Sequence, residues 1–462
     1  MKNSVSLEKI VSLSKRRGFV FPGSEIYGGF ANSYTYGPYG VELKNNIKNL
    51  WWRLFVHNRQ DIVGIEGPIL LHPKVWEASG HVQGFNDALV DCKNCKNRFR
   101  ADHLVEEAIG VDLEGKIDKM NDAFKNKNIR CPVCNEFNWS DVRKFNMMFK
   151  TALNTTDAKN EEIAYLRPET AGAIFIEFKN IIDTTRQKIP FGIAQIGRAF
   201  RNEIVAGNFI FRLREFEQME IEYFIDPSSN WEDIFEKFLN DQANFAKLLG
   251  ATEDKLRRKE HEKEKLSHYS KKTVDLEYEF PFGFKELFGL AHRGDFDLTQ
   301  HSKFSGVDLS YFDQNTSKKF IPHVIEPTFG LDRCVLLALL SAYHEEQIEA
   351  ETRVVLKLPS YLSPVKAAVF PLVRNKPEIV QKAKEIFQIL SLNWVCEYDD
   401  NGNVGKRYRR QDEIGTPYCI TIDYDTLSLH TVTVRNRDTM KQDRVNIENL
   451  TSYLAEKLSP KL

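Results

Sequence analysis

The sequence contains no long apolar run. None of its segments approaches the roughly 18 consecutive apolar residues that a membrane-spanning helix needs. The first segment, MKNSVSLEKIVSLSKRRGF, mixes acidic and basic residues with short apolar steps, and it lacks the apolar core of a secretory signal. We therefore expect a soluble, cytoplasmic protein that makes no membrane contact.

The sequence also lacks an excess of charge of either sign. Its formal net charge is −1, from 64 Lys and Arg against 65 Asp and Glu. This balance excludes a positive potential over the whole molecule. Any contact with nucleic acid must therefore come from local basic patches.

Cysteines are few, with 7 in 462 residues. Three of them, Cys334, Cys396 and Cys419, stand alone in apolar surroundings, and an odd, dispersed set does not form a disulfide framework. The other four form two CxxC pairs, and four thiolates can close a tetrahedral structural Zn²⁺ site. Paired thiols without a metal are the alternative. The four are Cys92, Cys95, Cys131 and Cys134.

The length and the 42% hydrophobic content predict two or three domains with large cores. Residues 1–355 have the strand-rich pattern of an α+β body with antiparallel strands. This body carries two expected insertions, a cysteine-containing one at 91–145 and a charged helical one at 228–272. After a Pro- and Ser-containing boundary, residues 356–462 alternate strands and helices, which predicts a small α/β domain with a mixed or parallel sheet.

The segment 200–224, FRNEIVAGNFIFRLREFEQMEIEYF, alternates charged and apolar residues on both sides of a short break. With a period of two, Arg201 and Glu203 share one strand face. After the break, one parity holds Arg212, Arg214, Phe216, Gln218, Glu220 and Glu222, and the apolar residues lie mostly opposite. Arginine binds phosphate, phenylalanine stacks on a base and glutamate accepts from an amine, so this face could form a nucleotide site. A charged hairpin facing solvent fits the same alternation equally well.

Two further elements bear on this choice. In EPTFGLDRCVLLALL (326–340), Arg333 lies in the first turn of an apolar helix, after Gly330. Because the helix dipole favours anions at that end, an anionic ligand or a nearby carboxylate should accompany Arg333. The amphipathic segment 41–58, rich in apolar and tryptophan residues, predicts a long helix that is either core or subunit interface.

Three features in this order resemble the three motifs of class II aminoacyl-tRNA synthetases. The first is a helix preceded by proline, the second is FRxE followed by a loop and RxxxF, and the third is Gly-x-x-Arg before an apolar helix. Longer strings resemble the homodimeric glycyl-tRNA synthetases over nearly the whole chain. They are RGFVFPGSEIYGG, YGPYGVELKNN, WEASGHVQGFND, LRPETAG, GRAFRNEI, FRLREFEQMEIEYF, HSKFSGVDLSYF, IPHVIEPTFGLDR and GKRYRRQDEIGTPYCITIDYDT.

The resemblance implies an ATP site with Mg²⁺ on the phosphates. Arg201 would contact the α-phosphate, Glu203 the adenine amine and Phe216 the adenine ring. Arg333 would reach the γ-phosphate, and Arg293 is a further phosphate candidate. The full implied set is Arg201, Asn202, Glu203, Phe211, Arg212, Leu213, Arg214, Glu215, Phe216, Glu286, Leu287, Arg293, Gly330, Leu331, Asp332 and Arg333, with Arg201 and Arg333 as the catalytic pair.

The resemblance also implies a small acidic pocket for glycine, which offers only an ammonium and a carboxylate. Thr328 stands where the family often has serine, and its hydroxyl would exclude a larger amino acid. Of Arg98 and Arg100, Arg100 matches the family's substrate-side arginine better. The implied set is Arg98, Arg100, Glu169, Phe216, Glu217, Gln218, Met219, Glu220, Glu326, Pro327, Thr328, Phe329 and Gly330.

The implied activity is glycine–tRNA ligation, in which glycyl adenylate forms from glycine and ATP and its acyl group passes to tRNA(Gly). The C-terminal domain would bind the anticodon, with GKRYRRQDEIG supplying positive charge and Tyr408 available for stacking. The break at 204–208 would meet the tRNA acceptor end, and the chain would form a homodimer. The alternatives are a class II enzyme for threonine, proline or histidine, and a catalytically inactive relative that binds nucleic acid as an accessory subunit.

Overall fold

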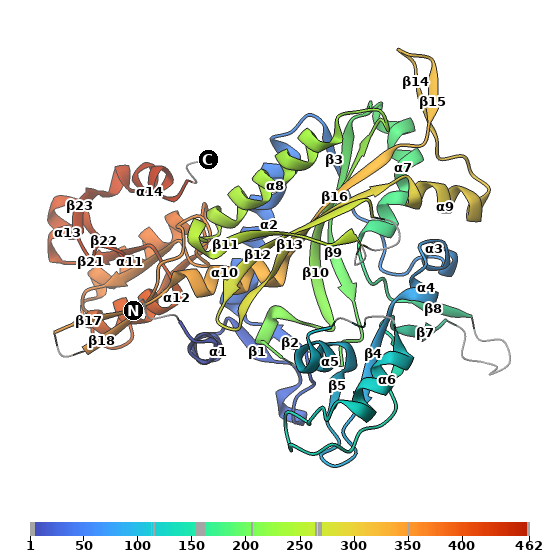
Figure 1. Cartoon of the computed structure of the whole chain (residues 1–462). Helices are drawn as coiled ribbons and strands as arrows, with labels where there is room; N and C mark the ends of the chain where they lie inside the picture. Colours follow the sequence, from blue (N-terminus) through green and yellow to red (C-terminus); the bar gives the residue numbers. More distant parts are fainter. Residues whose placement is uncertain are drawn as a thin grey trace.

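The computed structural model describes residues 5–459 except 112, 114–115, 154–161, 205–206, 264–265, 267–269 and 350. Its centre is a seven-stranded sheet in the order β11-β12-β13-β16-β10-β9-β3 (Figure 1). All neighbours are antiparallel except β3 and β9, which are parallel. The strands span β3 (Ile62–Ile65), β9 (Phe191–Phe200), β10 (Glu215–Ile225), β11 (Leu256–Glu260), β12 (Lys272–Phe280), β13 (Gly283–Gly294) and β16 (His323–Gly330).

One face of this sheet is covered by helices along most of its length. The covering helices are α2 (Pro38–Trp52), α8 (Trp231–Leu248) and α10 (Leu331–Ala342). Phe329 of β16 packs against Trp51 and Phe245, at ring-centroid distances of 5.7 and 5.6 Å. Met219 belongs to the same core. The odd-numbered residues of β10 and β16 thus face this layer, as the period of two requires.

The other face is covered only at one end. There α7 (Ala171–Thr185) packs on the sheet, with the rings of Phe178 and Phe224 4.5 Å apart. Toward the opposite ends of β10 and β16, the same face carries Gln218 beside Gly330 and Glu220 beside Thr328. The uncovered part of the sheet is therefore lined with polar side chains.

Residues 86–146 form a separate lobe below the sheet in Figure 1. Its three strands are β4 (Asn86–Asp91), β5 (Arg98–Arg100) and β6 (Arg143–Asn146), and its helices are α5 (Ala101–Ile109) and α6 (Ile117–Asn126). The lobe has its own small core, which includes Val105, Met120 and Trp139.

The expectation that the charged segment after α8 is a solvated helix is wrong. Residues 256–260, LRRKE, form strand β11 at the edge of the central sheet, hydrogen-bonded to β12. Four of its five residues are exposed. A lysine- and arginine-rich strand suits an exposed sheet edge because its charges oppose pairing with another chain.

The C-terminal part has a mixed five-stranded sheet, β20-β19-β21-β22-β23, as the alternation predicts. Pairs β19–β20 and β19–β21 are parallel, and the remaining two are antiparallel. The elements are β19 (Ala367–Pro371), α11 (Pro377–Ser391), β20 (Cys396–Tyr398), α12 (Val404–Ile414), β21 (Tyr418–Ile422), α13 (Tyr424–Leu429), β22 (Thr431–Asn436), β23 (Gln442–Asn446) and α14 (Leu450–Leu458).

The hairpin β17 (Tyr343–Ile348) and β18 (Glu351–Leu356) joins the two parts and packs on α12. Its fully buried Arg353 donates to Asp412 of α12 at 2.8 Å and to the carbonyl of Arg437 at 2.6 Å. Breaking a buried pair of this kind leaves an uncompensated charge, so this contact fixes the C-terminal sheet against the hairpin.

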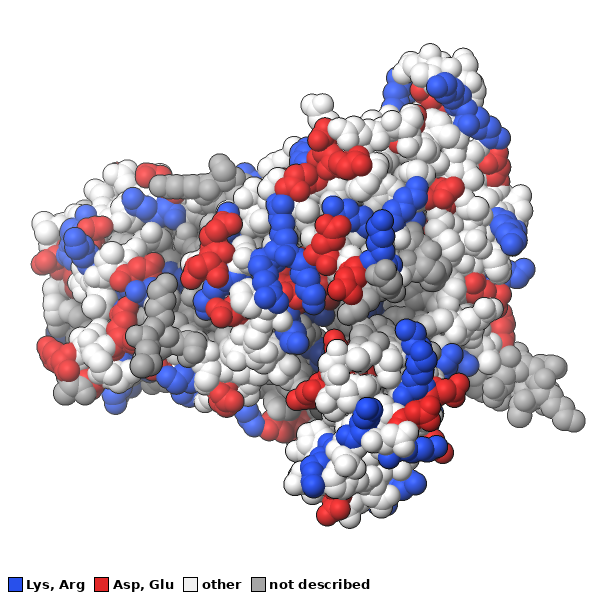
Figure 2. Space-filling model, in the orientation of Figure 1, with Lys and Arg blue, Asp and Glu red and all other residues white. Residues whose placement is uncertain are grey.

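The smaller elements connect these parts. They are α1 (Leu7–Arg17), β1 (Val20–Pro22), β2 (Tyr34–Tyr36), α3 (Pro73–Ala78), α4 (His81–Gly84), β7 (Lys150–Ala152), β8 (Ile163–Tyr165), α9 (Phe296–Ser305), β14 (Tyr311–Asp313) and β15 (Lys318–Phe320). Among the described residues, no helix is both long and apolar enough to cross a bilayer. Cationic and anionic side chains are interspersed on the face shown in Figure 2, in keeping with the balanced composition.

Candidate active site

A cleft of about 670 Å³ lies on the uncovered face of the central sheet. Its walls come from the strands of that sheet, the lobe at 86–146, the segment before α7 and the start of α10. Predicted site residues that line it are Arg100, Glu169, Arg201, Glu203, Phe211, Arg212, Leu213, Phe216, Glu217, Gln218, Glu220, Glu286, Arg293, Glu326, Thr328, Gly330, Asp332 and Arg333.

Arg201 is held flat at one wall of the cleft. Its guanidinium lies 5.3 Å from the ring centroids of both Phe85 and Phe216, and its Nε donates to the carbonyl of Pro168 at 3.1 Å. These contacts fix the plane of the guanidinium before any ligand binds. A pre-oriented planar fork suits an anion such as phosphate.

Glu203 and Arg212 lie near each other at the same end, with 3.8 Å between Oε2 and the guanidinium nitrogen. Burial raises the pKa of Glu203, and the charge of Arg212 opposes that rise. Their segments are not strands, since β9 ends at Phe200 and β10 begins at Glu215. Between them Phe209–Phe211 forms a 3₁₀ turn, so strict alternation does not extend to Arg212 and Arg214.

Arg333, in the first turn of α10, also lines the cleft. One of its terminal nitrogens donates to the carbonyl of Glu286 at 2.8 Å and lies 3.2 Å from its carboxylate, and the guanidinium lies over Phe211 at 4.5 Å. The charge of Arg333 lowers the pKa of Glu286. The carboxylate partner expected for this arginine is therefore Glu286, and both side chains face the cleft.

Two residues that the sequence did not reveal line the cleft beside Glu286. Nε2 of His261 lies 2.8 Å from Oδ2 of Asp275. Burial raises the pKa of Asp275, and the charge of Glu286 adds to that rise. Asp275 is one of three acids that alternate with apolar residues in TVDLEYEF, a pattern that resembles an ordinary surface strand.

The inner end of the cleft is strongly acidic. Glu169 and His81 lie 3.3 Å apart, and Glu220 accepts hydrogen bonds from Thr170 and, at 3.0 Å, from Thr328. Burial alone would raise the pKa of Glu169, but the contact with His81, followed by the charges of Arg293 and Arg201, lowers it to about 2. The Oε1 atom of Gln218 is buried and has no hydrogen-bond partner within the described chain.

Arg293 belongs to this inner end and does not face the phosphate side. Its guanidinium donates twice to Asp297, at 2.8 and 2.9 Å, and to Glu326 at 2.7 Å. Only 2% of the residue is exposed. Binding a phosphate would require it to leave two buried carboxylates, so this arrangement argues against the predicted phosphate contact and makes Arg293 the counter-ion of the acidic pocket.

Several other predicted residues do not line the cleft. Arg214 donates to the carbonyl of Glu203 at 2.9 Å and lies over the ring of Phe30, and Arg98 pairs with Asp91 at 2.5 Å. Two more are polar: the backbone N–H of Asn202 donates to the carbonyl of Met147, and Glu215 pairs with Arg198 at the surface. The remainder are buried and apolar, namely Met219, Leu287, Pro327, Phe329 and Leu331. The apolar members lie outside the cleft because successive strand residues point to opposite faces, and Leu331 starts a buried helix.

The four paired cysteines converge beside the core of the lobe. Their Sγ atoms all lie within 4.8 Å of one another, and the pairs Cys92–Cys134 and Cys95–Cys131 are 3.6 Å apart. A tetrahedral zinc with Zn–S bonds of about 2.3 Å would place its sulfurs roughly 3.8 Å apart. The four side chains therefore fit a structural zinc ion.

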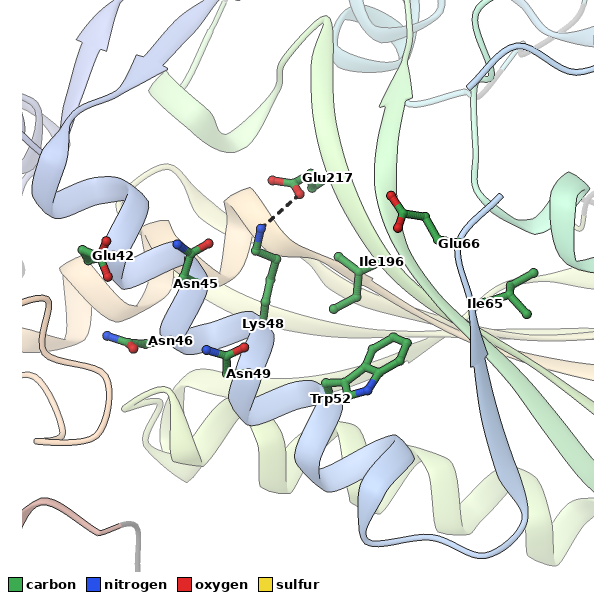
Figure 3. A pocket seen from close by; sticks show the side chains of 10 residues that line it. All are labelled: Glu42, Asn45, Asn46, Lys48, Asn49, Trp52, Ile65, Glu66, Ile196 and Glu217. Carbon is green, nitrogen blue, oxygen red and sulfur yellow. Dashed lines mark hydrogen bonds and ion pairs between the residues drawn. The ribbon is translucent and has the colours of Figure 1, made fainter. Parts of the chain in front are cut away.

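A second hollow, of about 690 Å³, lies beside α2 (Figure 3). One side consists of side chains from α2, including Asn45, Lys48 and Trp52, and the other of Ile65 and neighbours from β3 and β9. The Nζ atom of Lys48 lies 3.5 Å from Glu217 of β10. Trp51, by contrast, is fully buried in the core, so the two tryptophans of this helix divide between core and surface.

The basic helix α12 is more internal than its sequence indicates. Arg407 is buried and donates to three backbone carbonyls, and Arg410 pairs with Asp399. The hydroxyl of Tyr408 bonds to Thr421 at 2.6 Å, and its ring packs on Phe370. These contacts argue against Tyr408 as a stacking partner for RNA bases, because its ring is partly buried against Phe370. The predicted acceptor-end loop at 204–208 includes residues 205–206, which lie outside the described part of the chain.

Comparison with known proteins identifies relatives over the whole chain. A family described as "tRNA synthetase class II core domain (G, H, P, S and T)" matches residues 149–343, and one described as "Anticodon binding domain" matches residues 366–457. The glycine–tRNA ligase of Alkaliphilus oremlandii is 51% identical, with 99% of this chain and 100% of the relative covered. Those of Acetivibrio thermocellus and Clostridium tetani are each 52% identical, with 99% and 98% of both chains covered, respectively.

Proposed function

Because the chain belongs to the glycine–tRNA ligases, a class II synthetase family, we propose that glycine is activated by ATP in the cleft on the central sheet. The family confirms the predicted fold class and activity, and it does not favour the inactive accessory subunit. One observation carries the assignment to this cleft. A pre-oriented arginine for an anion and an acidic pocket for an ammonium group open into the same space.

We assign the outer part of the cleft to ATP. Arg201 would bind the α-phosphate, Phe216 would stack on the adenine and Glu203 would accept from its amine. Arg333 would bind the γ-phosphate. Of the two arginines that precede β10, Arg212 lines the cleft and Arg214 does not, which favours Arg212 as the further phosphate ligand.

Class II synthetases typically use magnesium, and we assign this ion to the part of the cleft near Arg333. Carboxylate oxygens are the ligands that Mg²⁺ prefers, and Asp275 and Glu286 supply them there. When bound, the ion would neutralise charge on the phosphates. His261 holds one oxygen of Asp275, which orients that carboxylate in advance.

We assign the inner end to glycine. The carboxylates of Glu169, Glu220 and Glu326 would surround the ammonium group, and Arg293 limits their mutual repulsion. Thr328 lies beside Glu220 and would occupy the space that a side chain on the amino acid needs. Arg100, of the two candidate arginines of the lobe, is the one that lines the cleft.

In this arrangement the glycine carboxylate attacks the α-phosphorus in line, and pyrophosphate leaves. The protein contributes position and charge, as is general for phosphoryl transfer, and no protein nucleophile is required. Arg201 stabilises the charge that develops on the α-phosphate. The adenylate then passes its glycyl group to the 3′-terminal ribose of tRNA(Gly), and AMP is released.

We further propose a homodimer formed through the face of α2 that borders the second hollow. This hollow is open, lies against the active-site strand β10 through the Lys48–Glu217 contact, and exposes part of Trp52 (Figure 3). An aromatic residue among asparagines and charges is typical of an interface with a polar rim. Analytical ultracentrifugation should give twice the chain mass, and a monomer at micromolar concentration would contradict the proposal.

We propose that the four cysteines of the lobe hold one structural Zn²⁺. Thiolates of two CxxC turns closing on one point support this, and the lobe's core is too small to be stable alone. Metal analysis of protein purified without chelator should give about one zinc per chain. Less than about half a zinc per chain would contradict the site.

We propose the domain division at residue 355/356, with the catalytic domain first and the anticodon-binding domain second. Two separate apolar cores support two domains, and the first core also takes in residues beyond the proposed boundary, namely Leu356, Leu358, Leu362, Val365 and Ile414. A cytoplasmic location is supported by the seven free cysteines, which suit a reducing compartment.

ATP–pyrophosphate exchange measured with each of the twenty amino acids tests the central proposal. Exchange should depend on glycine alone. Loss of that exchange on replacing Arg201 or Glu169, with the fold intact, would place the reaction in the cleft. Full exchange in both variants would place it elsewhere.

A further inference from the structure

A fully buried carboxyl lies directly behind the proposed glycine pocket. Glu222 of β10 has no exposed surface, and neither of its carboxylate oxygens has a hydrogen-bond partner within the described residues. In the register that pairs Glu220 with Thr328, Glu222 stands opposite Glu326 of β16. Glu222 does not line the cleft itself.

The groups around Glu222 are mostly anionic. Glu220, Glu222 and Glu326 offer carboxylate oxygens that all lie within 4.8 Å of one another. Arg293 of β13 bonds to Glu326 and to Asp297 of α9, so two carboxylates already share the one guanidinium. On the other side, Glu222 stands opposite the buried Ile193 of β9, which offers no charge or hydrogen bond from its side chain.

Two carboxylates side by side in an apolar layer cannot both stay charged. Like charges directly opposite on neighbouring strands repel, and an uncompensated buried charge is strongly unfavourable. Burial and the neighbouring carboxylates raise the pKa of Glu326 to about 8 although Arg293 lowers it, so this cluster holds a proton at neutral pH. The contact of Arg293 with Glu326 at 2.7 Å favours the charged form at Glu326. Glu222 has no such hydrogen-bonded contact, so it is the member of the pair that takes the proton.

We propose that Glu222 is a positioning residue of the amino-acid site: as a neutral acid it donates its proton to Glu326 and holds that carboxylate toward the ammonium group. This inference rests on the proposed function of the cleft. An oxygen of Glu222 lies within 4.8 Å of an oxygen of Glu326, and the hydrogen bond requires a change in the side-chain torsions of Glu222. Burial raises the pKa of Glu222 and the charge of Glu326 raises it further, with Arg293 opposing, which supports the neutral form.

A matched pair of variants tests the role. Glu222→Gln keeps the size and an N–H donor, and Glu222→Leu removes the donor. We expect Glu222→Leu to raise the KM for glycine about tenfold or more, because the charged carboxylate of Glu326 then loses one of its hydrogen bonds. We expect Glu222→Gln to retain a KM for glycine within about threefold of the unchanged enzyme, and both variants to keep the KM for ATP.

Infrared spectroscopy supplies a readout that a purely structural role would not change. At neutral pH, the difference spectrum between the unchanged enzyme and Glu222→Gln should contain the C=O band of a protonated carboxylic acid. Absence of that band would overturn the proposal. It would be overturned equally if Glu222→Gln raised the KM for glycine as much as Glu222→Leu, or if neither variant changed it. Should Glu222→Leu not fold, the infrared band and the Glu222→Gln kinetics still decide.

Glu169→Gln separates this inference from the one on which it rests. If Glu169→Gln leaves the KM for glycine unchanged, the pocket assignment itself fails. If it raises that KM while Glu222→Leu does not, only the role of Glu222 fails.

Discussion

Replacement of Arg201 by alanine should remove most of the adenylate-forming activity without unfolding the protein. The guanidinium is fixed between Phe85 and Phe216 and by one hydrogen bond to Pro168. A pre-oriented donor that meets developing charge contributes about 2.7–4 kcal/mol, which corresponds to a loss of roughly 10²- to 10³-fold in kcat. The stacking contacts are worth about 1 kcal/mol each at part-exposed sites, so the melting temperature should fall by only a few degrees.

The assay is glycine-dependent ATP–pyrophosphate exchange, with kcat and the KM for ATP measured separately. Arg201→Lys should retain the charge but lose the planar fork, and its activity should lie between those of Arg201→Ala and the unchanged enzyme. Arg198→Ala is the matched control, because Arg198 lies near the end of β9, three residues before Arg201, and forms an exposed pair with Glu215. Exposed pairs contribute little, so this control should have nearly full activity.

Two results would refute the reasoning. Exchange by Arg201→Ala within threefold of the unchanged enzyme would show that Arg201 does not meet the developing charge. A loss in Arg198→Ala equal to that in Arg201→Ala would show that the effect comes from disturbance of β9 and not from the cleft.

Further predictions concern the lobe, the acidic pocket and specificity. Cys134→Ser should lower the zinc content and speed hydrogen exchange throughout residues 86–146. The control is Cys396→Ser, which alters an equally part-buried thiol of the C-terminal sheet and should have neither effect. The pKa of Glu169 is lowered from about 4.3 in the unfolded chain to about 2. Its carboxylate therefore stabilises the fold fully above about pH 4.3, by up to about 3 kcal/mol, and this stabilisation is lost as the pH falls toward 2. The free energy of unfolding of Glu169→Gln should accordingly be lower than that of the unchanged enzyme at pH 7. Chemical denaturation should show that this difference in free energy becomes smaller below about pH 4. A difference that stays constant with pH would contradict the ion pair. Thr328→Ala should raise the kcat/KM ratio of alanine to glycine in the exchange assay, because it opens space beside Glu220; an unchanged ratio would show that another side chain excludes alanine.

The sequence predicted the parts of the site that follow from strict alternation. Phe216, Gln218 and Glu220 share the cleft face of β10, as the period of two requires, and Glu222 continues that face beneath α7. The alternation failed before Glu215, where the chain forms a 3₁₀ turn and Arg214 bends back to the carbonyl of Glu203. A period carries information only while the backbone remains extended.

Long-range pairing explains the residues that sequence reasoning missed or placed elsewhere. Asp275 and His261 reach the cleft only because β11 and β12 join the central sheet beyond β13, and a charge-rich segment does not reveal such pairing. Arg293 resembled a phosphate ligand, but a bulge in β13 next to His292 and the position of α9 place it between Asp297 and Glu326.

The sequence by itself determined the class of protein, the order of its domains, the face of β10 that lines the cleft and the two CxxC pairs. These depend on residue type and on spacing along the chain, which local geometry converts directly into a face or a turn. Only the tertiary structure decided which charges meet. It placed Arg201 beside two rings, gave Arg293 to the acidic end of the cleft, bound the hydroxyl of Tyr408 to Thr421 and left Glu222 buried opposite Glu326. Those outcomes depend on contacts between segments far apart in sequence, and burial then decides whether each charge is paired, neutral or presented to a ligand.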